Sequence, residues 1–370
     1  MVPIRILVVD DSVVIRRLLS DTLSGDPALE VVGTASDGRI ALAKIPVLKP
    51  DLITLDIEMP VMDGLETLAA VRKLYPKLPV IMFSTLTERG AAATLDALSL
   101  GASDYSTKPS HTVSPAVALE HIRIELIPKI KALCGIASLN LLPLAGTLPS
   151  LKVRVRSNPR IEIVAIGTST GGPAALAEVL PRIPNDFPVP IVVVQHMPPI
   201  FTRLLAERLA SRSAIPVEEG RPGVVLSPGH AWIAPGNFHM KVIRAGAGWC
   251  LNLNQGSKEN SCRPAVDVLF RSVAAACGAN VLGVVMTGMG SDGVLGAQAI
   301  RDTGGEVIIQ DEASSIIWGM PGLVHASGLA DAAYPLDCLA AEITHRVLES
   351  RGHRVPHDSK SYTTVERPSK

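Results

Sequence analysis

Five residues in the first third of the chain could together carry out phosphoryl chemistry. They are Asp10, Asp11, Asp56, Ser84 and Lys108. Crowded carboxylates repel one another unless a cation neutralises them, and oxygen ligands with few protein donors suit Mg²⁺. A carboxylate beside Mg²⁺ can attack a phosphoryl donor and become an aspartyl phosphate, whose oxygens a hydroxyl and an ammonium group can then bind. The alternative is that the paired acids only cap the helix that follows them.

A second set of residues could perform nucleophilic catalysis. Ser169 lies in the sequence GTSTGGP (167–173), and GxSxG between a strand and a helix is typical of a nucleophilic serine on a tight turn. A serine hydroxyl needs a base, which His196 could supply after the next apolar run. Asp292, in the sequence TGMGSDG, could orient the imidazole. The spacing therefore predicts a triad of Ser169, His196 and Asp292.

Less specific interpretations compete with this triad. The glycine-rich loop could bind a dinucleotide, but that function requires an acid where this chain has Gln195 and His196. The order Ser…His…Asp also differs from that of α/β-hydrolases. Other candidate bases are His230, His239 and His325. Glu259 and Asp267 are other candidate acids, which we interpret as a solvated loop charge and a helix-face charge.

The elements that must position these residues alternate between strands and helices. In the first third, apolar runs predict strands at 4–9, 30–35, 52–55, 80–83 and 103–106. Helical patterns occupy 13–23, 38–44, 65–74, 89–100 and 115–133. Such alternation is typical of a doubly wound parallel sheet, in which ligands bind beyond the carboxyl ends of the strands. All five residues of the acidic set are predicted at that edge.

The second half of the chain has the same alternation. Strands are predicted at 161–166, 189–195, 281–286 and 306–310. Helices are predicted at 173–180, 201–211, 264–276 and 294–303, around a loop- and strand-rich segment at 220–254. We therefore expect a first domain at 1–134, a linker at 135–158, a second α/β domain at 159–350 and a disordered tail at 351–370.

Composition limits the class of protein. Lys plus Arg and Asp plus Glu both number 35, which gives no reason to expect a nucleic acid or a membrane surface as partner. The five cysteines have no metal-ligand spacing, which favours reduced thiols. The N-terminal apolar run is too short for a signal peptide, and glycines interrupt the uncharged stretch at 272–291. We expect a cytoplasmic protein without membrane insertion.

The motifs VVDDS, LDIEMPVMDG, the Ser84-Thr85 pair and TKP around Lys108 resemble those of response-regulator receiver domains. The resemblance implies that a histidine kinase is the phosphodonor for Asp56, and that Ser84 and Tyr105 relay the change to the opposite face. It implies that Mg²⁺ is held by Asp11, Asp56 and the backbone carbonyl of Glu58, and we include the neighbouring Asp10 in the expected metal site.

The motifs AIGTSTGGP, QHMPPIFTRLLAERL, SPGHAWIAPG, RPAVDVLF and MTGMGSDG resemble the chemotaxis receptor methylesterases of the CheB family. The resemblance implies a flavodoxin-like receiver followed by a Rossmann-like α/β esterase domain that needs no cofactor. It places Thr170 and Met289 in the oxyanion region. It also implies hydrolysis of glutamyl methyl esters on chemoreceptor helices, which releases methanol, and deamidation of receptor glutamines.

Two other functions remain open from the sequence. The second domain could be a phosphorylation-dependent binding module without catalysis, or an esterase that acts outside chemotaxis. If the family pattern holds, we expect the unphosphorylated receiver to cover the Ser169 site, and phosphorylation of Asp56 to open it.

Overall fold

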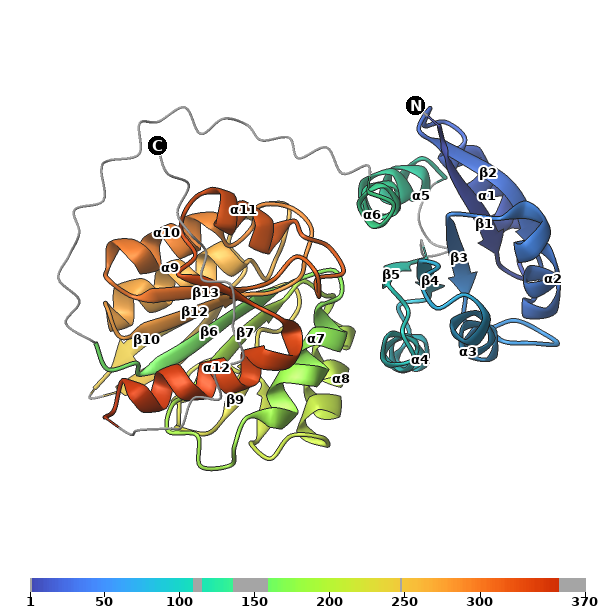
Figure 1. Cartoon of the computed structure of the whole chain (residues 1–370). Helices are drawn as coiled ribbons and strands as arrows, with labels where there is room; N and C mark the ends of the chain where they lie inside the picture. Colours follow the sequence, from blue (N-terminus) through green and yellow to red (C-terminus); the bar gives the residue numbers. More distant parts are fainter. Residues whose placement is uncertain (1, 109–114, 136–158, 247, 353–370) are drawn as a thin grey trace. The chain divides into compact units, whose positions relative to one another are not determined.

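The computed structural model describes residues 2–108, 115–135, 159–246 and 248–352, which form two compact units. Each unit is built on a parallel sheet with helices on both faces (Figure 1). This arrangement confirms the predicted fold class. Residues 136–158 of the predicted linker, and residues 353–370 of the predicted tail, lie outside the described residues.

The sheet of the first unit has the strand order β2-β1-β3-β4-β5. Its strands are β1 (Ile4–Val9), β2 (Leu29–Ala35), β3 (Leu52–Asp56), β4 (Val80–Ser84) and β5 (Asp104–Thr107). Its helices are α1 (Val13–Leu23), α2 (Gly38–Leu48), α3 (Gly64–Leu74), α4 (Glu88–Ser99), α5 (Pro115–His121), a π-helical turn (Ile122–Leu126) and α6 (Ile127–Leu133). All five predicted strands and helices are confirmed, with ends that differ by a few residues.

Local sequence explains these elements. Polar side chains cap helices α1 to α4, and Asp63 with Glu66 forms a capping box at the start of α3. On one face of the sheet, Ile6, Val8 and Phe83 pack against apolar residues of α1, of the π-helical turn and of α6. Because these strands are buried on both faces, they read as continuous apolar runs.

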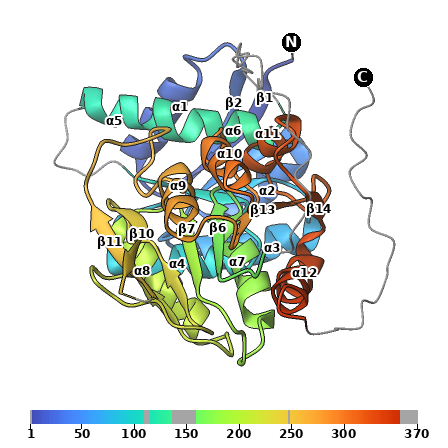
Figure 2. The same ribbon diagram turned by 90° about the vertical axis from the view of Figure 1, so that its left-hand side faces the viewer.

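The sheet of the second unit has the order β14-β13-β12-β6-β7-β9-β8, with all neighbouring strands parallel. Its strands are β6 (Ile163–Thr168), β7 (Ile191–Gln195), β8 (Val217–Glu219), β9 (Ala231–Ile233), β12 (Val281–Val285), β13 (Glu306–Gln310) and β14 (Ala332–Tyr334). An antiparallel hairpin, β10 (His239–Ala245) with β11 (Gly248–Asn254), packs beside helix α9 (Val266–Cys277) (Figure 2).

The helices of the second unit cover both faces of this sheet. They are α7 (Gly172–Val179), a 3₁₀ turn (Leu180–Arg182), α8 (Pro199–Ala210), α9 (Val266–Cys277), α10 (Val294–Asp302), α11 (Met320–Ala326) and α12 (Leu336–Glu349). Helices α9, α10 and α11 lie on one face, and α7, α8 and α12 lie on the other (Figure 1).

The sequence prediction for this unit was incomplete. No element was predicted after residue 310, where the structure has α11, β14 and α12. Helix α11 has seven residues that include Pro321 and Gly322, and β14 has three residues, so neither is long enough to show a period. Helix α12 does repeat apolar residues every four positions, at Leu339, Ile343 and Val347, and that signal was missed. No helix in the described ranges is long and apolar enough to cross a bilayer.

Candidate active site

The acidic set of the first unit meets at the carboxyl edge of its sheet. Asp10 follows β1, Asp56 ends β3, and Lys108 follows β5. The Lys108 ammonium lies 2.8 Å from Asp10 Oδ2 and 2.7 Å from Asp56 Oδ2. Oxygen atoms of Asp10, Asp11 and Asp56 lie within 4.8 Å of one another. The strand order therefore brings together the residues that the sequence placed at this edge.

Burial and repulsion govern the charges of this pocket. Burial raises the pKa of Asp56 to about 6, with a further contribution from the charge of Asp10 and against the effect of Lys108. Burial also raises the pKa of Asp10. The two carboxylates outweigh burial at Lys108 and raise the pKa of its ammonium. One ammonium thus faces three carboxylates, so the donor set fits a divalent cation with oxygen ligands.

The other predicted residues of this pocket lie around the acidic set. A cavity is lined by Asp11, Asp56, Ile57, Glu58, Ser84, Thr85, Gly90 and Lys108. The Ser84 hydroxyl donates to the carbonyl of Gly90 at 3.1 Å. Tyr105 lies one residue into β5, opposite Met82 of β4, and Lys129 donates to its carbonyl at 2.6 Å. The exposed side chain of Glu58 forms an ion pair with Arg89.

The second unit places the predicted triad in the segments that follow three neighbouring strands. Thr168 of β6 pairs with Gln195 of β7, so Ser169 and His196 follow directly opposed residues. On the other side β6 pairs with β12, whose continuation leads to Asp292. The Ser169 amide donates to the carbonyl of Thr287 at 3.0 Å. Parallel pairing thus brings three distant segments to one rim.

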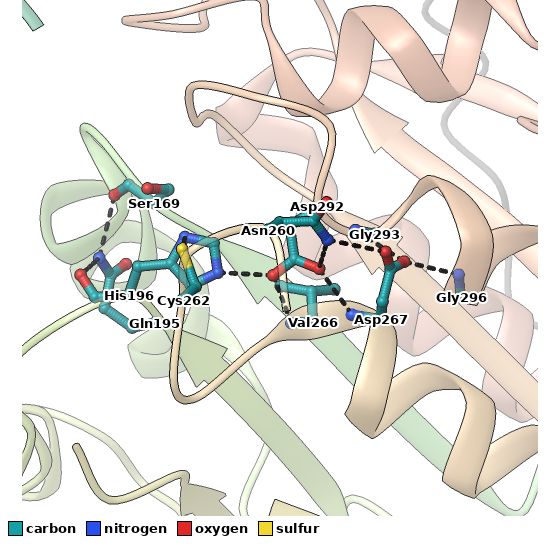
Figure 3. A network of polar contacts seen from close by, with 10 residues as sticks. All are labelled: Ser169, Gln195, His196, Asn260, Cys262, Val266, Asp267, Asp292, Gly293 and Gly296. Carbon is teal, nitrogen blue, oxygen red and sulfur yellow. Dashed lines mark hydrogen bonds and ion pairs between the residues drawn. The ribbon is translucent and has the colours of Figure 1, made fainter. Parts of the chain in front are cut away.

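His196 and Asp292 form a direct contact. His196 Nε2 lies 2.8 Å from Asp292 Oδ2, and His196 Nδ1 lies 3.5 Å from the thiol sulfur of Cys262 (Figure 3). Among the described residues no hydrogen bond joins Ser169 to His196; instead, the Gln195 amide donates to the Ser169 carbonyl at 3.0 Å. The histidine–aspartate half of the triad is therefore assembled, while the serine hydroxyl is not yet bonded to the base.

The two partners shift each other's pKa. Burial disfavours the charged form of Asp292, but the hydrogen bond and charge of His196 and two backbone amides outweigh it and lower the pKa of this carboxyl. Burial alone would lower the pKa of His196, but hydrogen bonds to Asp292 and Cys262 raise it to about 10. In this arrangement the raised pKa favours the form in which both ring nitrogens carry a proton, and Nδ1 must lose its proton before the imidazole can act as a base.

The loop after β12 lies against Ser169. A Cβ added to Gly288 would stand 2.8 Å from Ser169 Cβ and 2.5 Å from Met320 Sδ, so only glycine fits there without a shift. Met289, predicted in the oxyanion region, is the next residue, and Thr170 begins the turn from Ser169 into α7. Thr170 is thus the sequence neighbour of Ser169, and Met289 is the sequence neighbour of Gly288, which lies against Ser169.

The alternative bases and acids have other partners. His230 stacks on Trp232 with ring centroids 4.1 Å apart, His239 contacts the carbonyl of Ser257, and His325 lies against Trp318. Glu259 forms an ion pair with Arg271 at 2.6 Å. The interpretation of Asp267 as a helix-face charge was wrong, because its side chain is buried. A first-turn acid can face inward when a neighbouring helix N-terminus supplies amide donors.

Sequence reasoning missed three residues whose side chains contact the candidate triad. Gln195 holds the Ser169 carbonyl, Cys262 contacts His196, and Asn260 contacts Asp292. Asn260 and Cys262 come from the loop before α9, whose course no local pattern predicts. The sequence did offer one signal for this network: Asp267 lies in the first turn of a predicted helix. Acids at that position interact with unpaired amide groups at helix starts, so a polar network near the N-terminus of this helix could have been expected.

Comparisons with known proteins identify the family. The model for the CheB methylesterase matches residues 164–343, and the model for the response regulator receiver domain matches residues 6–116. A protein-glutamate methylesterase/protein-glutamine glutaminase of Trichodesmium erythraeum is 55% identical over 93% of this chain and 99% of its own length. The chain belongs to the CheB methylesterase family.

A second relative agrees with this assignment. A protein of the same name from Nocardioides is 50% identical over 95% of this chain and 98% of its own length. The solved catalytic domain of the Thermotoga maritima CheB methylesterase is 40% identical, with a TM-score of 0.49, over 50% of this chain and 98% of that domain. In this chain a receiver domain precedes the CheB methylesterase domain.

The raised pKa of Asp56 predicts a pH-dependent affinity for Mg²⁺. Below pH 6 the carboxyl holds a proton that the metal must displace, so the affinity should fall about tenfold per pH unit there and level off above it. Calorimetric titration of the full chain measures this. Asp56→Asn should reduce the pH step to the part that comes from the raised pKa of Asp10, while the exposed Asp21→Asn should retain the whole step. An affinity independent of pH across this range contradicts the prediction.

Proposed function

We propose that this CheB-family chain is a protein-glutamate methylesterase and protein-glutamine glutaminase that acts on chemoreceptors and is activated by phosphorylation of Asp56. The main support is the contact between His196 Nε2 and Asp292 Oδ2 at 2.8 Å, on the rim that carries Ser169. Relatives that match nearly the whole chain are named for both activities.

In the proposed mechanism Asp292 accepts from Nε2 of His196, which leaves Nδ1 as the nitrogen that can take a proton. His196 Nδ1 removes the proton of the Ser169 hydroxyl, and the oxygen attacks the carbonyl carbon of the ester. Backbone amides near Thr170 and Met289 stabilise the oxyanion. The carbon–oxygen bond to methanol breaks, and His196 returns the proton to the leaving group. Water then hydrolyses the acyl-serine; with glutamine, ammonia leaves instead.

The receiver unit belongs to a class of domains that bind Mg²⁺ at their phosphorylation site. We propose that Asp10, Asp11, Asp56 and the carbonyl of Glu58 hold the ion, which neutralises the carboxylates and the incoming phosphoryl oxygens. A histidine kinase would supply the phosphoryl group to Asp56. Lys108 would pair with the phosphoryl oxygens, and Ser84 with Tyr105 would relay the change.

We also propose the boundaries that the sequence predicts: a receiver at 1–134, a linker at 135–158, a catalytic domain at 159–350 and a tail at 351–370. The family matches at 6–116 and 164–343 lie inside the two proposed domains. A cytoplasmic location is proposed with them, because receptor helices and a kinase are the proposed partners.

Replacing the nucleophile tests the proposed chemistry. We expect Ser169→Ala to reduce methanol release from methyl-labelled receptor membranes by at least about 10³-fold, because no other residue supplies the attacking oxygen. The matched control Ser211→Ala, at an exposed serine of the same unit, should keep the parental rate. Volatile label measures the release. Receptor binding without release would support the binding-module alternative, and release from other esters alone would support an esterase of another pathway.

Removing the phosphorylation site tests the proposed regulation. With a small phosphodonor and Mg²⁺ the rate of methanol release should rise, by about 5–150-fold for a typical coupling energy between two sites. Asp56→Asn should keep the basal rate and show no rise, because an amide cannot form the acyl phosphate. The control Asp21→Asn should respond like the parent. If Asp56→Asn responds fully, activation does not proceed through this residue.

A further inference from the structure

A second buried carboxylate lies behind the His196–Asp292 pair. Asp267, in the first turn of α9, is 1% exposed. Within the described residues no cation pairs with it. Its Oδ1 accepts from the amides of Gly293 at 2.9 Å and Gly296 at 2.7 Å, and its Oδ2 accepts from Asn260 Nδ2 at 3.0 Å. A buried charge held only by hydrogen bonds is costly, so its position calls for an explanation.

Asp292 accepts from backbone amides of α9, the helix that carries Asp267. Its Oδ1 accepts from the Asp267 amide at 2.9 Å and from Asn260 Nδ2 at 3.0 Å. Its Oδ2 accepts from the Val266 amide at 2.7 Å and from His196 at 2.8 Å. Asn260 therefore bridges the two carboxylates (Figure 3).

These bonds amount to reciprocal capping of two helices. The N-cap residues of α9 and α10, Ala265 and Gly293, provide no side-chain cap. Instead, Asp292 before α10 accepts from the first amides of α9, and Asp267 in α9 accepts from the first amides of α10. Each carboxylate thus satisfies donors that would otherwise be unpaired in the interior.

A close approach of the helices makes this possible. A Cβ added to Gly296 would lie 2.4 Å from Phe270 Cβ and 3.2 Å from Asp267 Cα. Glycine at this position lets the backbone of α10 come near enough for its amide to reach the Asp267 carboxylate. The position of the loop that carries Asp292 is consequently set from α9.

We propose that Asp267 and Asn260 are positioning residues for the catalytic base. Asp267 fixes the start of α10 beside Asp292, and Asn260 holds Asp292 Oδ1, so that Oδ2 stays on His196 Nε2. Neither residue touches the reacting atoms; both act through Asp292. The inference rests on the proposed function only in taking His196 as the base.

Asn260→Gly tests this with little risk to folding. Asn260 is exposed and has φ of 50°, a conformation that glycine adopts readily. Loss of the bridge leaves Asp292 Oδ1 held by the Asp267 amide alone. We therefore expect the limiting, pH-independent kcat of the full chain to fall by about 10–100-fold with KM unchanged. The groups that face the imidazole are Asp292 and Cys262. A looser Asp292 should therefore lower the pKa of His196, measured by NMR titration.

Asp267→Asn should act in the same direction, because an amide in place of the carboxylate can no longer accept from three donors. Since both residues act through Asp292, the double variant should lose less than the product of the single losses. The matched control is Asp337→Asn, an exposed acid in the first turn of α12. It should leave kcat and the pKa of His196 at the parental values.

The outcomes separate this inference from the proposed function. If the parent releases no methanol while Asn260→Gly still lowers the pKa of His196, the function fails and the positioning role stands. A folded Asn260→Gly with parental kcat and parental His196 pKa would overturn the role. If Asp267→Asn does not fold, Asn260→Gly alone decides.

Discussion

The hydrogen bond between His196 Nε2 and Asp292 Oδ2 is the interaction on which the catalytic account depends. It determines which imidazole nitrogen faces the acid and which remains for the serine. It also offsets the cost of burying a carboxylate, because the lowered pKa of Asp292 comes largely from its partner. Amides of α9 and the side chain of Asn260 donate to the remaining lone pairs of Asp292. Both oxygens of this buried carboxylate therefore accept hydrogen bonds, which offsets the cost of its burial.

The parallel sheets bring the residues of each site together at one edge. In the second unit β6 lies between β7 and β12, so segments about a hundred residues apart reach one rim. In the first unit the order of strands gathers Asp10, Asp56 and Lys108 in the same way. In both cases polar groups that would repel one another or remain unpaired lie where strands end and helices begin, where backbone donors are available.

Much of this was predictable from sequence, for physical reasons. Buried parallel strands read as apolar runs, and α1 has apolar residues at helical spacing, so β1, β13 and α1 have the predicted bounds. The edge that carries Ser169, His196 and Asp292 followed from the direction of the strands. The roles of Asn260, Cys262 and Asp267 did not, because they depend on how a loop and two helix ends pack. Short elements such as β14 are held by sheet pairing rather than by local preference.

The central claim is that Asp292 holds the His196 imidazole in a charged, Nε2-bonded state at the rim. Nitrogen NMR titration of this imidazole in the full chain and in Asp292→Asn tests it most directly. The account predicts a pKa far above the ordinary 6.5 in the parent, and a marked fall when the carboxylate becomes an amide. An imidazole that titrates near the ordinary value in both proteins would contradict it.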